Sequence, residues 1–223
     1  MQKKSNDWTT FKFNFKSKKG KQFKEILSST DIVLLCDDSS KMVNIRNSKI
    51  MWDDVREITY SIIRLVTLIK GDGVDIYFLN RPTLKNVTNV EILNSIFSIN
   101  PEGNRPLMRS INKIYNDNIH KQLHLIVITD SLPCNQNINI LMNNINNKNE
   151  KYISFILLNS NLNNLHEWYK NIEYNKYIKV YDQNSKYQEN NILFNYTDYI
   201  IDILSGFYSN KITNPIMRPC ILQ

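Results

Sequence analysis

Short apolar runs alternate with longer amphipathic stretches along most of the chain after residue 30. The runs predict five strands: Ile32–Cys36, Val74–Leu79, Leu123–Thr129, Tyr152–Leu158 and Tyr177–Tyr181. Near-continuous apolar segments such as LHLIVIT and YISFILL are typical of central strands that are buried on both faces. We therefore expect a mostly parallel central sheet.

Apolar residues recur at intervals of three and four between the predicted strands. This spacing predicts helices over Met51–Ile69, Pro106–Asn116, Asn137–Asn146, Leu162–Asn171 and Asn190–Tyr208. Strands that alternate with helices in this way indicate a three-layer α/β/α fold, with helices flanking the sheet on both faces.

The positive charge of the chain is concentrated near its N-terminus. Residues 1–24 hold eight lysines and one acid, Asp7, so their local balance is 8 − 1 = +7, which equals the net charge of all 223 residues. We therefore divide the chain into a basic N-terminal arm (1–30), one domain (31–205) and a C-terminal tail (206–223). The 42% hydrophobic content excludes the disordered class.

Membrane and secretory signals are missing from the sequence pattern. No apolar run reaches the about 18 residues that a membrane span requires, and no apolar segment follows the first basic residues. The three cysteines are far apart and form no CxxC pair. We therefore expect a cytoplasmic protein without a transmembrane segment.

Two predicted strands end in acidic residues. The segment VLLCDDSSKMV at residues 33–43 continues into Asp37 and Asp38, and LIVITDSL continues into Asp130. The carboxyl ends of neighbouring parallel strands meet at one edge of a sheet, so we expect Asp37 and Asp130 to converge. A simpler alternative is that Asp37 to Ser40 only turn the chain and cap a helix. A phosphoryl-accepting receiver domain is disfavoured, because the strand about 45 residues onward ends in Asn80 rather than in an aspartate.

Three loops together suggest a family. In their order and spacing, CDDSSKM, PEGNRPLMRSI and VITDSLP resemble the metal-ion-dependent adhesion site of von Willebrand factor type A domains, over roughly residues 31–205. The resemblance implies a Rossmann-like α/β protein-interaction module whose bound Mg²⁺ receives an acidic residue of a partner. On this mapping Asp37, Ser39 and Asp130 match metal ligands, whereas Lys41 replaces a serine and Arg105 replaces a threonine.

Both departures introduce a fixed cation beside the same site. Two cations there would repel Mg²⁺ by several kcal/mol at an intermediate dielectric, and they could pair with the carboxylates instead. We therefore expect a degenerate site that supplies its own positive charge and has no cofactor. The alternative is that both side chains point to solvent and leave a weak three-ligand Mg²⁺ site. The residues expected at the partner-binding surface are Asp37, Asp38, Ser39, Lys41, Arg105 and Asp130.

A catalytic constellation is not apparent. The sequence has no Gly-x-x-x-x-Gly-Lys-Ser loop, GxSxG elbow or HExxH motif. His120 and His124 are expected to be ordinary surface or boundary residues. The sequence therefore favours a protein that is not an enzyme.

The two ends of the chain suggest other partners. The basic arm contains three phenylalanines that alternate with polar residues, Phe11, Phe13 and Phe15. One interpretation is an edge strand that packs its phenylalanines on the domain. The alternative is that they form, with the lysines of residues 1–24, a surface that binds nucleic acid or an anionic membrane. The C-terminal CILQ fits a prenylation signal at Cys220. In a eukaryotic cytoplasm, including one that hosts a virus, this signal and the basic arm would together attach the protein to a membrane; the alternative is an unmodified tail.

Overall fold

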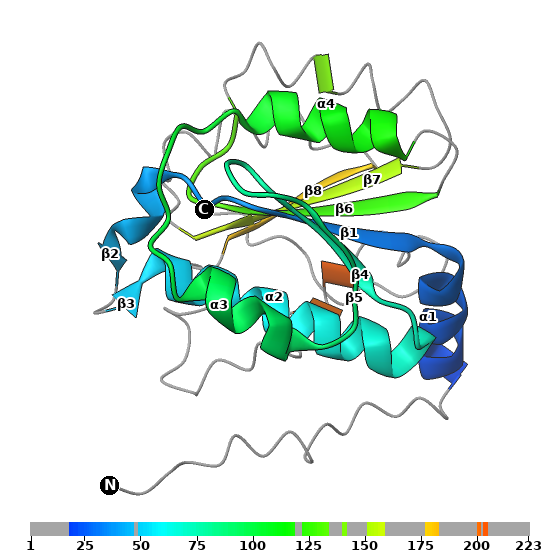
Figure 1. Ribbon diagram of the computed structural model, residues 1–223. Helices are drawn as coiled ribbons and strands as arrows, with labels where there is room; N and C mark the ends of the chain where they lie inside the picture. The colour runs from blue at the N-terminus through cyan, green and yellow to red at the C-terminus, as the bar shows by residue number, and fades with distance from the viewer. Residues whose placement is uncertain are drawn as a thin grey trace, which may run out of the picture.

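The computed structural model describes residues 18–46, 49–118, 122–133, 140–141, 151–158, 177–182, 200–201 and 203–204. Its main element is a six-stranded sheet in the order β5-β4-β1-β6-β7-β8 (Figure 1). The strands are β1 (Asp31–Cys36), β4 (Val74–Phe78), β5 (Leu84–Val87), β6 (Leu123–Thr129), β7 (Lys151–Leu157) and β8 (Ile178–Asp182).

All neighbouring strands of this sheet are parallel except β4 and β5, which are antiparallel. The five predicted strands all form, and each end lies within one residue of its predicted position. β5 was not predicted, because its sequence LKNV is short and half polar. It also contains Asn86, whose φ of 52° lies in the left-handed region. The mostly parallel α/β sheet expected from the sequence is therefore confirmed.

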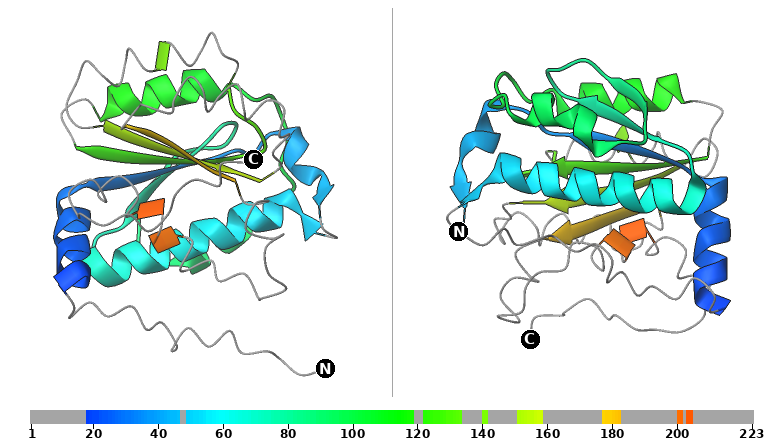
Figure 2. Two further views of the ribbon diagram at one scale, coloured as in Figure 1. Left: turned by 180° about the vertical axis from the view of Figure 1, so that it is seen from behind. Right: turned by 60° about the horizontal axis from the view of Figure 1, so that its bottom comes forward.

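Helices lie on both faces of the sheet. α4 (Leu107–Asp117) covers one face, and α2 (Met51–Lys70) and α3 (Asn94–Phe97) cover the other, as Figure 1 and the reverse view in Figure 2 show. The predicted helices over Met51–Ile69 and Pro106–Asn116 correspond closely to α2 and α4. The three remaining helix predictions lie largely outside the described residues. Of those segments only 140–141, 200–201 and 203–204 are described, and these residues are helical.

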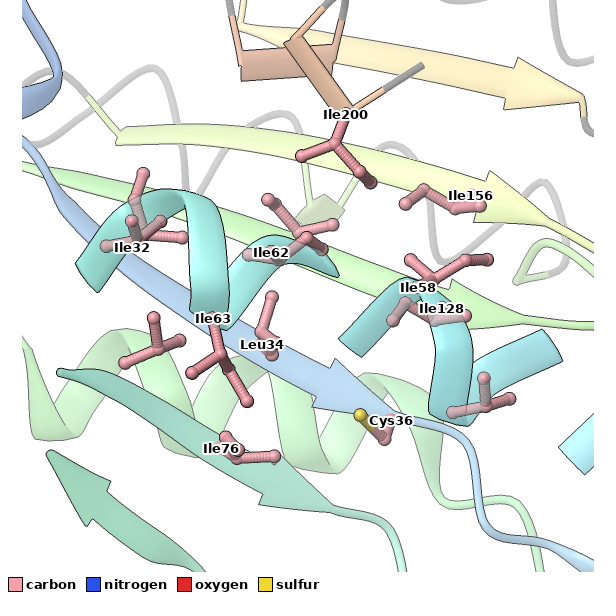
Figure 3. Close-up of a cluster of buried hydrophobic side chains, with 14 of the residues drawn as sticks. Ile32, Leu34, Cys36, Ile58, Ile62, Ile63, Ile76, Ile128, Ile156 and Ile200 are labelled. Atoms are coloured by element: carbon pink, nitrogen blue, oxygen red, sulfur yellow. The ribbon is translucent and has the colours of Figure 1, made fainter. Parts of the chain in front are cut away.

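β1 shows why the central strands are continuously apolar. Ile32, Leu34 and Cys36 point to the α2 side of the sheet, where they pack with Ile58, Ile62 and Ile63 of α2 (Figure 3). Val33 and Leu35 point to the α4 side. Both faces of the strand are thus buried. Burial of each aliphatic side chain stabilises the folded state by about 1.5–3 kcal/mol relative to leaving that side chain exposed.

The first described helix belongs to the segment that the sequence assigns to the basic arm. α1 (Lys18–Ser29) precedes β1, and Leu27 is fully buried in the α2-side core. Residues 1–17, which include the three alternating phenylalanines, lie outside the described residues, as does Cys220. Among the described helices, none is long and apolar enough to cross a membrane.

His124 is buried in the core, so the expectation that it is a surface or boundary residue was wrong. Its side chain is fully buried on β6, and its Nε2 lies 2.8 Å from Ser154 Oγ on β7. The prediction was wrong because β6 is covered on both faces, so a polar residue within the strand is buried with the rest. Burial lowers the pKa of His124 to about 3. His120 lies outside the described residues.

Candidate functional site

The parallel pairing of β1 and β6 brings the two acidic loops together. Cys36 is the register partner of Ile128, and Asp37 N donates a hydrogen bond to Ile128 O at 2.9 Å. Asp37 and Asp130 therefore leave the sheet at the same carboxyl edge, as the sequence indicated. The tip of the neighbouring loop, which carries Arg105, joins them there.

Arg105 lies between the two acidic side chains. Its Nε is 3.0 Å from Asp37 Oδ2 and 3.5 Å from Asp130 Oδ1. Its Nη2 donates hydrogen bonds to Thr129 Oγ1, at 3.1 Å, and to the carbonyl of Ser131. The side chain is 19% exposed. The guanidinium thus points into the site, and its planar donors contact two segments of the loop edge, the turn after β1 at Asp37 and residues 129–131 after β6.

The Asp37 carboxylate is fully buried and receives hydrogen bonds at both oxygens. Oδ1 accepts from the backbone N–H of Ser39 at 3.0 Å, which closes the turn after β1. Oδ2 accepts from Thr129 Oγ1 at 2.7 Å and from Arg105. Thr129 was missed by the sequence analysis, although its place just before Asp130 at a strand end was the available signal.

Asp38 turns away from Asp37 and binds the loop after β4. Its Oδ1 accepts from the backbone N–H of Asn80 at 2.9 Å, and its Oδ2 lies 3.4 Å from Arg81 Nε. Burial raises the pKa of Asp38, an effect that these hydrogen bonds and the charge of Arg81 oppose. The sequence left open whether Asp38 pairs with Lys41 or serves a metal. The structure instead pairs it with Asn80 and Arg81.

Arg81 is a second residue of this loop network, after Thr129, that sequence reasoning missed. Its guanidinium donates to the carbonyls of Ile96, Ile99 and Asn100 and stacks over the Trp52 ring, with Cζ 4.9 Å from the centroid. This side chain therefore ties the α3 segment to the acidic loop through Asp38. No motif signalled these contacts, because three of the partners are backbone carbonyls, which leave no trace in the sequence.

Lys41 lies at the rim of the site. It belongs to the 3-10 helix Ser40–Val43, which buried Met42 anchors to the core. The Lys41 side chain is 60% exposed, and its Nζ is 3.9 Å from Asp130 Oδ2. Ser39, immediately before, is buried, and its Oγ has no hydrogen-bond partner among the described residues.

Exposed aliphatic residues adjoin Lys41. Val43 and Ile45 follow it, and Ile50 lies opposite Ile45 in the hairpin of β2 (Ile45–Arg46) and β3 (Lys49–Ile50). All three are exposed, and Ile45 most of all, at 74%. We call Lys41, Val43, Ile45 and Ile50 the rim patch. Figure 1 shows the hairpin at the carboxyl end of β1, opposite α1.

Burial divides the six predicted partner-binding residues into two groups. Asp37, Asp38 and Ser39 are inaccessible and shape the loops from within. Lys41 is exposed, while Arg105 and Asp130 reach the surface only in part. In the described part of the chain, no group of three or more His, Cys, Asp or Glu side chains is arranged to hold a metal ion.

Comparison with protein-family models and with curated proteins finds no match for this sequence. The functional assignment therefore depends on the fold and on the contacts of these loops.

Proposed function

We propose that the protein is a non-enzymatic interaction module with a von Willebrand A-like fold, and that its partner binds at the carboxyl-edge loops. The mostly parallel α/β sheet and the convergence of the three loops support this reading. The observation that carries it is the Arg105–Asp37 contact. The buried charge of the site has an internal partner, which leaves the exposed Lys41 to receive a group from outside.

Arg105 takes the place of the metal ion in this proposal. Its guanidinium bridges Asp37, Thr129 and Asp130, as a bound cation would bridge ligands from separate loops. A divalent ion about 4 Å from this charge would be repelled by on the order of 8 kcal/mol at an effective dielectric of about 20. The residues present therefore do not fit Mg²⁺ while Arg105 remains in place, and no role is assigned to a metal.

The rim patch defines the chemistry of the partner. Lys41 offers an ammonium group whose exposed pairing with Asp130, at 3.9 Å, is worth little in water. A partner carboxylate can replace this contact at small cost. The exposed side chains of Val43 and Ile45 would pack against apolar residues beside that carboxylate. The partner is accordingly a protein segment with an acidic residue flanked by apolar ones.

Affinity capture from the native host tests this function. Full-length wild type is compared with Lys41→Glu, which reverses the rim charge, and with Arg105→Ala. Arg64→Glu is the matched control, because Arg64 is an exposed cation on α2 that belongs neither to the rim patch nor to residues 1–24. We expect to capture a protein that binds wild type and the control with equal affinity. Its affinity for Lys41→Glu should be at least tenfold lower, which corresponds to a loss of about 1.4 kcal/mol in binding free energy. Equal capture by Lys41→Glu would contradict the proposal.

The charge asymmetry of the chain favours a second candidate function, binding of nucleic acid or anionic membrane through residues 1–24. Deletion of residues 1–17 tests it without removing α1, whose Leu27 belongs to the core. Affinity for duplex DNA or for phosphatidylserine vesicles should fall with salt and be lost in the deletion variant. Affinity that survives the deletion would rule out residues 1–17 as the binding segment. Intact-mass measurement of protein from a eukaryotic host tests whether Cys220 carries a prenyl group.

A further inference from the structure

A hollow of about 510 Å³ lies apart from the Asp37–Arg105 contact, between the end of β4, the turn that follows it and the first two turns of α4. Its polar lining includes Asn80, Thr83, Arg109, Ser110 and Lys113. This volume is within the roughly 300–1,000 Å³ that is typical of small-molecule sites. Among the described residues that line it, none is an aspartate or a glutamate.

Two cations of the hollow have no partner among the residues that the structure describes. Arg109 and Lys113 are four residues apart, so they lie on the same face of α4. Both are exposed, and neither forms an ion pair or hydrogen bond with another described residue. Like charges at this spacing repel each other and destabilise a helix. An anion between them would convert this repulsion into two attractions.

The other cations near the hollow are already paired. Arg81 uses its guanidinium for Asp38 and for three backbone carbonyls. Lys85, on β5, lies 2.8 Å from Asp75 Oδ2 and 2.6 Å from Tyr77 Oη. The contrast singles out Arg109 and Lys113 as the groups available to a ligand.

The start of α4 adds a favourable potential for an anion. Pro106, at the N-cap, makes no side-chain capping bond, and the first turn of the helix contains no acid. The positive end of the helix dipole is therefore not compensated by an acidic side chain of the helix itself. Ser110 and Thr83 bring hydroxyl groups to the same hollow.

We propose that this hollow binds the phosphate group of a small phosphate ester. The fork of the Arg109 guanidinium matches two phosphate oxygens, and Lys113 supplies the second positive charge. The hydroxyls of Ser110 and Thr83 donate hydrogen bonds to the remaining oxygens. The apolar lining, which includes Leu79 and Pro106, accommodates the organic part of the ester. The site is independent of the rim patch and does not require a protein partner.

Calorimetric titration of the full-length protein tests the site with inorganic phosphate and adenosine 5′-monophosphate, and with adenosine as the uncharged probe. We expect one site that binds both phosphate-bearing probes and not adenosine. Arg109→Ala and Lys113→Ala should each weaken binding about tenfold or more, because each removes a charged contact. Both side chains are exposed, so the variants should fold, which circular dichroism checks.

Arg64→Ala is the matched control, since Arg64 is an exposed arginine on α2, on the other face of the sheet. It should leave phosphate affinity unchanged, and so should Lys41→Glu, which separates this proposal from the protein-interaction function. Three results would overturn the assignment. The first is the absence of phosphate binding at concentrations up to about 10 mM. The second is a loss of phosphate affinity in Arg64→Ala equal to that in Arg109→Ala. The third is tighter binding of a phosphoserine peptide than of adenosine 5′-monophosphate.

Discussion

Arg105 Nε lies 3.0 Å from Asp37 Oδ2, although 68 residues separate the two in the chain. Asp37 is fully buried, and Arg105 is largely buried. Taking a carboxylate out of water costs several kcal/mol unless a cation or hydrogen bonds replace the lost solvation. The contact therefore holds the β1 loop to the loop before α4, and it makes the two residues dependent on each other.

Arg105→Ala should lower the free energy of unfolding by about 3 kcal/mol, because it leaves the buried Asp37 carboxylate with only Thr129 and the Ser39 backbone as partners. Urea unfolding followed by circular dichroism measures this. The double variant Arg105→Ala/Asp37→Asn should recover part of the loss, since it also removes the unpaired charge. A loss below about 1 kcal/mol in the single variant would mean that solvent compensates Asp37.

Metal binding should be absent in wild type and restored by reversing the two departures. We expect no micromolar affinity for Mg²⁺ or Mn²⁺ in a calorimetric titration of wild type, because Arg105 lies between Asp37 and Asp130. Lys41→Ser/Arg105→Thr replaces both cations with hydroxyl ligands and should bind Mg²⁺ measurably. Adding Asp37→Ala to this variant should abolish that binding. Micromolar binding of Mg²⁺ or Mn²⁺ by wild type would refute the hypothesis that Arg105 and Lys41 replace the metal. Failure of the double variant to bind Mg²⁺ would argue against the resemblance to the von Willebrand A site.

Stability should fall with acidification through His124. Its folded-state pKa of about 3 lies below its ordinary value of 6.5, so below pH 6.5 the unfolded state binds more protons. The stabilisation is complete above pH 6.5 and is lost as pH falls toward 3. Between pH 7.5 and pH 5 the loss should be roughly 2 kcal/mol.

His124→Gln provides the comparison for this pH dependence. Urea unfolding at several pH values should show that the free energy of unfolding falls less steeply with decreasing pH in the variant than in wild type, whatever the absolute stability of the variant. An unchanged slope would assign the pH dependence to other groups.

Gly103→Ala should destabilise the protein more than Gly71→Ala does. Gly103 has φ +94°, and a Cβ there would lie 2.7 Å from Asn80 Oδ1; its carbonyl also accepts from Ser40 N. We expect a loss of about 1–3 kcal/mol in thermal or urea unfolding. Gly71→Ala is the control, because Gly71 has φ +76° but no atom within 4 Å of a Cβ, so only the backbone strain applies. Equal losses would show that the contact with Asn80 adds nothing.

The loop network was only partly predictable from the sequence. Adjacent strand ends were enough to bring Asp37 and Asp130 to one edge, because parallel strands share their carboxyl edge. The pairing of Asp38 with Arg81 was not predictable. Arg81 follows β4 by three residues, and its partners depend on how the next loop folds back past Ile96 and Asn100.

The order of apolar and polar residues by itself determined the five predicted strands, α2, α4 and the α/β class. A strand that is buried on both faces appears as a short apolar run, and a helix that is buried on one face appears as apolar residues at intervals of three and four. The concentration of lysines in residues 1–24 was equally explicit. Only the tertiary structure decided that Arg105 points inward while Lys41 points to solvent. Both are cations in polar loops, and the direction of each side chain depends on contacts across the chain. Arg105 is drawn in by the buried Asp37, whereas Met42 packs in the core and leaves Lys41 at the rim.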